Sequence, residues 1–278
     1  GETADGTLFI VMEYVDGVTL LSELKAAHTR GMRLGPAKAR AIGWQTARVL
    51  ARTHERGIYH RDLKPANLML VDDDAVVGGV RIKILDFGIA KLRPGAAGTE
   101  SGVPDDDDVI ATSMGDQQPG TFAYMAPEQF GTYQGYTGHE GQMDVYALGV
   151  MMYQMLAGRL PLYSPDPLVM MGLAQAREPE RLTAIDTTLP VELADLVHRM
   201  LAKEIQARPT MAQVCDALAA QLGVGRSNDS VHIRGLAEGT GALAGKASSQ
   251  ELPDTASANE AAMAATADAP AVGGTAGA

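Results

Sequence analysis

The spacing of apolar residues along the chain predicts a mainly helical domain with two short strands. Residues 68–71 and 81–85 are short apolar runs on either side of a polar, glycine-containing segment, which predicts a β-hairpin. Residues 143–156 are apolar on nearly all sides of a helix and should therefore be buried. Further runs with helical spacing predict helices over residues 37–56, 193–202 and 211–222.

The composition changes at about Gly223. Residues 223–278 contain no Phe, Tyr or Trp, and Ala, Gly, Ser and Thr predominate. Such a segment cannot bury enough apolar surface to offset the entropy lost on ordering, so we predict a disordered tail. Alanine propensity alone allows a short helix over residues 259–267.

Charge and cysteine content narrow the class of protein. The formal net charge is −11 and no basic stripe is present, so nucleic acid is not expected as a main partner. Cys215 is the only cysteine, which excludes an internal disulfide and fits a reducing, cytoplasmic compartment. Its apolar neighbours Val214 and Leu218 favour a buried structural thiol over a reactive one. No apolar run approaches the ~18 residues of a membrane span.

Three short motifs point to the chemistry of the chain. Residues 60–67 read HRDLKPAN, residues 86–88 read DFG after an apolar run, and residues 126–128 read APE. Each motif is weak alone, but this order and spacing are hard to obtain by chance. Together they resemble the motifs of the eukaryotic-like (Hanks-type) serine/threonine protein kinases found in bacteria.

The resemblance runs from about residue 7 to residue 222 and implies an α+β, protein-kinase-like fold. Residues 1–17 would hold a remnant small-lobe strand, at residues 8–12, and the interlobe hinge; residues 18–222 would form the helical large lobe. The family's glycine-rich loop, strand lysine and helix glutamate are missing, and the first lysine is Lys25. We therefore expect a kinase domain that has lost most of its small lobe and that self-associates through its uncovered strand.

The resemblance implies catalytic roles for five residues. Asp62 would accept the proton of an attacking hydroxyl, Lys64 would neutralise a γ-phosphate oxygen of ATP, and Asn67 and Asp86 would hold Mg²⁺. An ordinary surface-turn aspartate is the weaker alternative for Asp62, given its neighbours. The hydroxyl of Thr121 would bond Asp62 and Lys64, and the position of Lys64 favours Ser or Thr over Tyr as the acceptor in protein substrates.

Four residues would line the adenine site by the same resemblance. Met12 would lie at the rear of the pocket and Met69 would form its floor. Backbone groups of Glu13 and Val15 would pair with the purine edge. Because backbone contacts leave little signature in a sequence, each of the four is equally well a plain strand or core residue.

Other matched positions imply structural roles. His60 would pack beneath the aspartate motif, and Glu128 would form a buried ion pair with Arg208. Asp144, near the start of the apolar helix, would anchor the backbone of the catalytic loop. A capping role at the helix start is an alternative for Asp144, and both roles can hold together.

Arg61 points to regulation, because kinases with this arginine are typically switched by a phosphate in the loop before APE. Thr112 and Ser113 lie at a suitable distance before Thr121 to receive it. A dianionic phosphate facing Arg61 would order the loop through charge-assisted bonds. The acidic run at residues 105–108 is interpreted as a solvated insert, with recognition of a specific partner as the alternative.

Two functions remain open from the sequence. The first is an ATP- and Mg²⁺-dependent protein serine/threonine kinase, favoured by the undamaged catalytic loop and metal aspartate. The second is a non-catalytic, kinase-like module that binds partners through its large lobe. The missing strand lysine and its glutamate favour the second for this polypeptide by itself, so we expect feeble activity or none.

Overall fold

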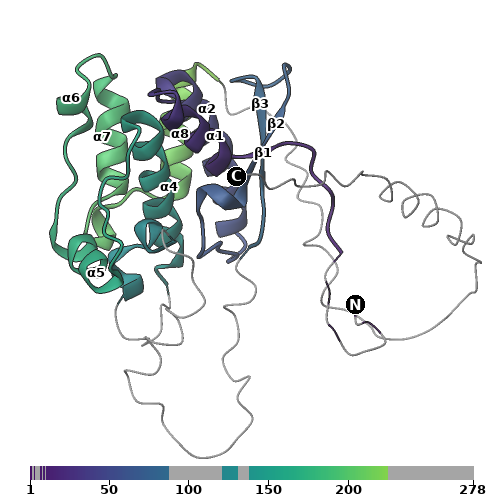
Figure 1. Cartoon of the computed structure of the whole chain (residues 1–278), viewed down its shortest axis with the longest axis horizontal. Coiled ribbons are helices and arrows are strands. Elements are labelled where there is room, and N and C mark those ends of the chain that lie inside the picture. Colours follow the sequence, from purple (N-terminus) through teal and green to yellow (C-terminus); the bar gives the residue numbers. More distant parts are fainter. Residues whose placement is uncertain are drawn as a thin grey trace, which may run out of the picture. The chain divides into compact units, whose positions relative to one another are not determined.

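The computed structural model describes residues 1, 3, 7, 9, 11–87, 121–130 and 138–224. Three strands form one antiparallel sheet in the order β1-β2-β3, which stands beside the helices (Figure 1). The strands are β1 (Val18–Thr19), β2 (Leu68–Asp72) and β3 (Val80–Ile84). The α-helices are α1 (Leu20–Thr29), α2 (Gly35–His54), α4 (Glu140–Ala157), α5 (Pro167–Ala176), α6 (Leu182–Ile185), α7 (Val191–Met200) and α8 (Met211–Leu222). Single 3₁₀ turns occur at η1 (Pro65–Asn67), η3 (Thr121–Tyr124), η4 (Pro127–Phe130) and η5 (Ile205–Ala207).

Helix α4 forms the centre of the helical core. It contacts α2, α6, α7 and α8, and its residues are buried almost without interruption from Met143 to Leu156. A helix that is apolar all round has no face suited to water, so it is covered on every side. It ends at Gly158, whose φ of 74° gives the left-handed cap that favours glycine. The predicted buried helix is confirmed.

The predicted hairpin is also confirmed, and it is fixed to α2. Leu70 pairs with Ile82 in the β2–β3 register, and both side chains are buried. The amide of Gln45 on α2 binds β3 at two points, because its Nε2 donates to the Val80 carbonyl (2.8 Å) and its Oε1 accepts from the Ile82 N–H (3.1 Å). The hairpin is therefore tied to the helical core. The predicted helices at residues 37–56, 193–202 and 211–222 form as α2, α7 and α8.

The strand predicted at residues 8–12 is wrong at Phe9, Val11 and Met12, which lie in no strand. Val11 and Met12 are 83% and 70% exposed. A strand needs a neighbour to pair its backbone, and the described sheet begins instead at β1, paired with Leu70 and Met69.

Three remaining predictions have separate outcomes. Cys215 is half-buried at the margin of the core, rather than fully enclosed. The predicted tail beyond residue 224, with its short helix, lies outside the described residues. Within the described part of the chain, no helix is both long and apolar enough to cross a membrane.

The close packing of α4 on α7 yields a stability prediction. Gly149→Ala should lower the free energy of unfolding by ~1–3 kcal/mol despite its gain in helix propensity. Its new Cβ would lie 2.9 Å from Cβ of Met200, an atom near the backbone that cannot easily move aside.

Gly172→Ala on α5 is the matched control. No atom lies within 4 Å of its added Cβ, so helix propensity should raise the free energy of unfolding by up to ~1 kcal/mol. Chemical denaturation measures both variants. Equal effects at the two positions would contradict the described approach of α7 to α4.

Candidate active site

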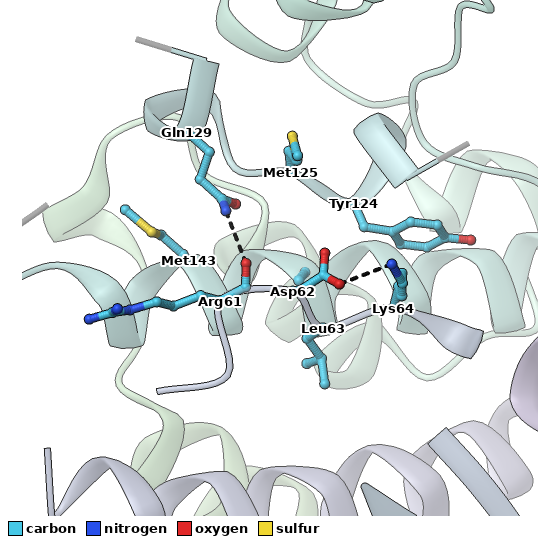
Figure 2. A pocket seen from close by; sticks show the side chains of 9 residues that line it. Arg61, Asp62, Leu63, Lys64, Tyr124, Met125, Gln129 and Met143 are labelled. Carbon is cyan, nitrogen blue, oxygen red and sulfur yellow. Dashed lines mark hydrogen bonds and ion pairs between the residues drawn. The ribbon is translucent and has the colours of Figure 1, made fainter. Parts of the chain in front are cut away.

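The catalytic loop brings three of the predicted residues together. Lys64 Nζ lies 2.9 Å from Oδ2 of Asp62, and Nδ2 of Asn67 donates to the Asp62 carbonyl at 2.9 Å. Asn67 closes the turn η1, which starts at Pro65, and only 7% of Asn67 is exposed. The loop thus folds back on itself, so that an acid and a cation face the same hollow (Figure 2).

Asp144 on α4 holds this loop by its backbone. Its Oδ2 accepts from the His60 N–H and its Oδ1 from the Arg61 N–H, both at 2.8 Å. Asp144 is 1% exposed and lies inside α4, whose N-cap is His139, so the capping alternative is wrong. A buried carboxylate must find hydrogen-bond donors, and here the donors are the backbone of the catalytic loop.

His54 is a residue of this network that the sequence interpretation missed. It ends α2, and its Nε2 lies 2.8 Å from Oδ2 of Asp144. Its ring packs beside that of Tyr59, with the centroids 5.1 Å apart. The available signal was a histidine on the apolar side of the helix, six residues before His60, but its partner lies 90 residues away in sequence.

His60 connects the catalytic loop to the DFG segment. Its Nε2 lies 2.9 Å from the Leu85 carbonyl, its ring packs against Phe87, and it is fully buried. Asp86, between these two residues, is exposed and has a φ of 50°. Arg61 also has a positive φ, of 61°. Two non-glycine residues with left-handed backbones therefore flank the site, a costly arrangement that the surrounding structure must maintain.

The donor set suits a magnesium ion. Because Nδ2 of Asn67 is engaged by the Asp62 carbonyl, its amide oxygen is the group left for a cation. The exposed Asp86 carboxylate is the second candidate ligand. Among the described residues no group of three or more His, Cys, Asp or Glu gathers as a metal site. Mg²⁺ needs no such group, because it usually keeps several waters and takes one or two protein carboxylates.

The segment at residues 121–130 lies across the hollow from the catalytic loop (Figure 2). The guanidinium of Arg208 makes two bonds to the Glu128 carboxylate, at 2.6 and 2.9 Å, and its side chain is fully buried. The Tyr124 hydroxyl donates to Gln154 Oε1 on α4 at 2.7 Å. Burial raises the pKa of Tyr124 well above its usual range, so it remains a neutral donor. Thr121 begins η3, but its side chain lies outside what the structure describes.

The residues expected around adenine differ in how far the described part of the chain covers them. Met12 is 70% exposed, and the Glu13 carboxylate lies 2.6 Å from Nζ of Lys83 on β3. Val15 and Met69 are half-buried, and Met69 stands opposite Lys83 in the β2–β3 register. With 70% of its surface exposed, Met12 does not form the enclosed rear of a pocket among the described residues.

Of the residues in the regulatory prediction, the structure describes only Arg61, the proposed receiver of the phosphate. Thr112 and Ser113 lie outside the described residues, as does the acidic run at residues 105–108. The Arg61 guanidinium lies 3.4 Å from Glu140, and its buried Nε has no hydrogen-bond partner among the described residues. Reception of a phosphate by Arg61 therefore stays a prediction.

The buried arginine yields a second stability prediction. Arg208→Lys should lower the free energy of unfolding by ~1–3 kcal/mol, the cost of leaving buried acceptors unsatisfied. A lysine keeps the charge but cannot reproduce the bonds that Arg208 makes to Glu128 and to the carbonyls of Ala202, Gln142 and Lys203.

Arg181→Lys is the matched control, because the exposed pair of Arg181 with Asp195 should contribute little. Its effect on the free energy of unfolding should stay within ~0.5 kcal/mol in the same denaturation experiment. A small effect at both arginines would mean that Arg208 is not the buried link described.

Comparison with known proteins agrees with this geometry. Residues 2–218 match the protein kinase domain family. The chain is 32% identical over 259 residues to serine/threonine-protein kinase PknB of Mycolicibacterium smegmatis, covering 91% of this chain and 37% of that protein. It is 35% identical over 224 residues to serine/threonine-protein kinase Pkn2 of Myxococcus xanthus, covering 79% and 24%. It is 33% identical over 224 residues to serine/threonine-protein kinase A of Synechocystis, covering 77% and 39%.

These matches span between 24% and 39% of the length of the three relatives. The family match itself covers most of the chain and includes the catalytic loop, the DFG segment and the buried pair at Glu128 and Arg208. The chain belongs to the protein kinase family, among the Hanks-type serine/threonine kinases of bacteria.

Proposed function

We propose that this chain carries the large-lobe half of an enzyme that transfers the γ-phosphate of ATP to serine or threonine hydroxyls of proteins. The observation that carries the proposal is the carboxylate of Asp62, 2.9 Å from the Lys64 ammonium, on a loop held by Asp144. Such an arrangement positions a base and a cation around a reacting hydroxyl before any substrate binds.

Each residue has a distinct task in the proposed reaction. The substrate hydroxyl oxygen attacks the γ-phosphorus, the bond from that phosphorus to ADP breaks, and the hydroxyl proton passes to Asp62. Lys64 stabilises the negative charge on the phosphoryl oxygens. The segment at residues 121–130 lies opposite and would hold the substrate peptide, with Thr121 bonding Asp62 and Lys64. The position of Lys64 supports Ser or Thr over Tyr as acceptor.

Asn67 and Asp86 would hold magnesium, which when bound neutralises charge on the phosphates. The engaged Nδ2 of Asn67 and the exposed carboxylate of Asp86 support this assignment. Glu13, Val15 and Met69 remain the proposed contacts of the adenine ring. The single cysteine supports a cytoplasmic location.

Replacing the proposed base tests the activity. In a fusion that places the small lobe of a bacterial relative ahead of this chain, Asp62→Asn should lower kcat by ~10²–10⁴ with little change in KM, because the carboxylate acts during transfer. The measurement is Mg²⁺-dependent phosphate transfer from ATP to a serine peptide.

Asp74→Asn, in the exposed hairpin turn, is the matched control and should leave kcat unchanged. A kcat of Asp62→Asn within a few-fold of the unsubstituted fusion would show that Asp62 is not the base.

We also propose that the 278-residue chain by itself is feeble or inactive and can act as a binding module. No lysine precedes Lys25, and losing one preorganised charge near the reacting groups typically costs ~10²–10³ in rate. The exposed side chains of Phe9, Val11, Met12 and Tyr14, close together in the sequence, support self-association, because soluble monomers rarely expose large contiguous apolar patches.

Light scattering and nucleotide titration test this second proposal on the purified chain. We expect oligomers and weak ATP binding. Tyr14→Ser together with Val11→Ser should reduce the oligomers, whereas Val191→Ser, at another exposed apolar position, should not. A monomer that binds ATP in the micromolar range would contradict the proposal.

A further inference from the structure

Gln129, the residue directly after APE, links the segment from Ala126 to Gln129 to the catalytic loop (Figure 2). Its Oε1 accepts from the Ala126 N–H at 2.8 Å, and its Nε2 donates to the Arg61 carbonyl at 3.3 Å. Since one partner can only donate and the other can only accept, the orientation of the amide is fixed. Gln129 is half-buried and lines the same hollow as Asp62 and Lys64.

The peptide unit that Gln129 contacts is the one that orients Asp62. Arg61 has a φ of 61°, and a non-glycine residue held in this region costs about 1–3 kcal/mol. The peptide between Arg61 and Asp62 is engaged at both ends. Its N–H, on Asp62, donates to Nδ1 of His60 at 3.3 Å, and its carbonyl, on Arg61, accepts from Gln129. Both bonds are long, so losing either one should free this peptide to rotate.

The other side chains that anchor residues 121–130 bind different parts of the molecule. Glu128 binds Arg208, which precedes α8, and Tyr124 binds Gln154 on α4. These bonds fix where the segment lies but do not touch the catalytic loop. Gln129 reaches the loop itself, one residue from Asp62.

We propose that Gln129 is a positioning residue, which makes the orientation of Asp62 depend on the seating of the segment from Ala126 to Gln129. When the segment is seated, Gln129 holds the Arg61 carbonyl and keeps the strained peptide in place. When the segment leaves, the peptide is released and Asp62 loses its alignment with Lys64. The catalytic meaning of this coupling rests on the proposed function of Asp62.

Two variants separate positioning from simple anchoring of the segment. Gln129→Glu keeps an acceptor for the Ala126 N–H but loses the donor for the Arg61 carbonyl. Gln129→Ala loses both. Gln175→Glu, on the exposed face of α5, introduces the same charge change away from the site and is the matched control.

The deciding measurement is amide hydrogen exchange at Asp62, followed by NMR on the full 278-residue chain, with thermal unfolding in parallel. Exchange should quicken about 5-fold in both Gln129 variants, the effect of one lost hydrogen bond. Their unfolding temperatures should lie only a few degrees below that of Gln175→Glu, the scale of one or two lost hydrogen bonds. The measurement needs neither nucleotide nor phosphate transfer, so its failure is distinct from failure of the proposed function, which the Asp62→Asn kinetics test.

Two results would overturn the inference. In the first, Asp62 exchanges at the unsubstituted rate in both variants, which would mean that other contacts hold the peptide. In the second, only Gln129→Ala quickens exchange, which would mean that Gln129 anchors its own segment and does not position the loop.

Discussion

The structure depends on one buried carboxylate. Asp144 sits inside the most buried helix of the molecule, and leaving its charge unpaired there would be very costly. The backbone N–H groups of His60 and Arg61, with the ring of His54, supply the donors that prevent this. The hydrophobic core and the catalytic loop therefore stabilise each other, because α4 cannot keep Asp144 buried unless the loop is in place.

A second buried charge must also find partners. Arg208 is fully buried and carries a charge, so it too must be satisfied, and it binds Glu128 together with several carbonyls. The segment opposite Asp62 is thus fixed by a second buried charge, as the loop is fixed by the first. Replacing one partner of such a pair leaves the other charge buried alone, which is strongly destabilising. Both walls of the hollow hence rest on the helical core.

A feature could be predicted from the sequence where the interactions that form it are local in the chain. Helices α2, α4 and α8 were predictable because their apolar spacing is local. The hairpin was predictable because its two strands are joined directly by a short turn. The strand at residues 8–12 failed because strand formation depends on a partner that no local pattern reveals. His54 and Gln129 were missed because each binds a group 60 or more residues away, in one case a backbone carbonyl, which any residue provides. The positive φ of Arg61 and Asp86 was equally hidden, since neither is a glycine.

The positive φ values of Arg61 and Asp86 are maintained by contacts with the helical core. A relaxed loop would turn these two residues to ordinary backbone angles and move Asp62 and Asp86 out of their described positions. Core groups oppose that relaxation: Asp144 holds the Arg61 N–H, and His60 holds the Leu85 carbonyl beside Asp86. The described residues therefore hold Asp62 and Asp86, the proposed base and the proposed metal ligand, in place without a nucleotide. Charge over the phosphates is a separate requirement, and Lys64 is the cation that the described loop places beside Asp62, 2.9 Å from its carboxylate.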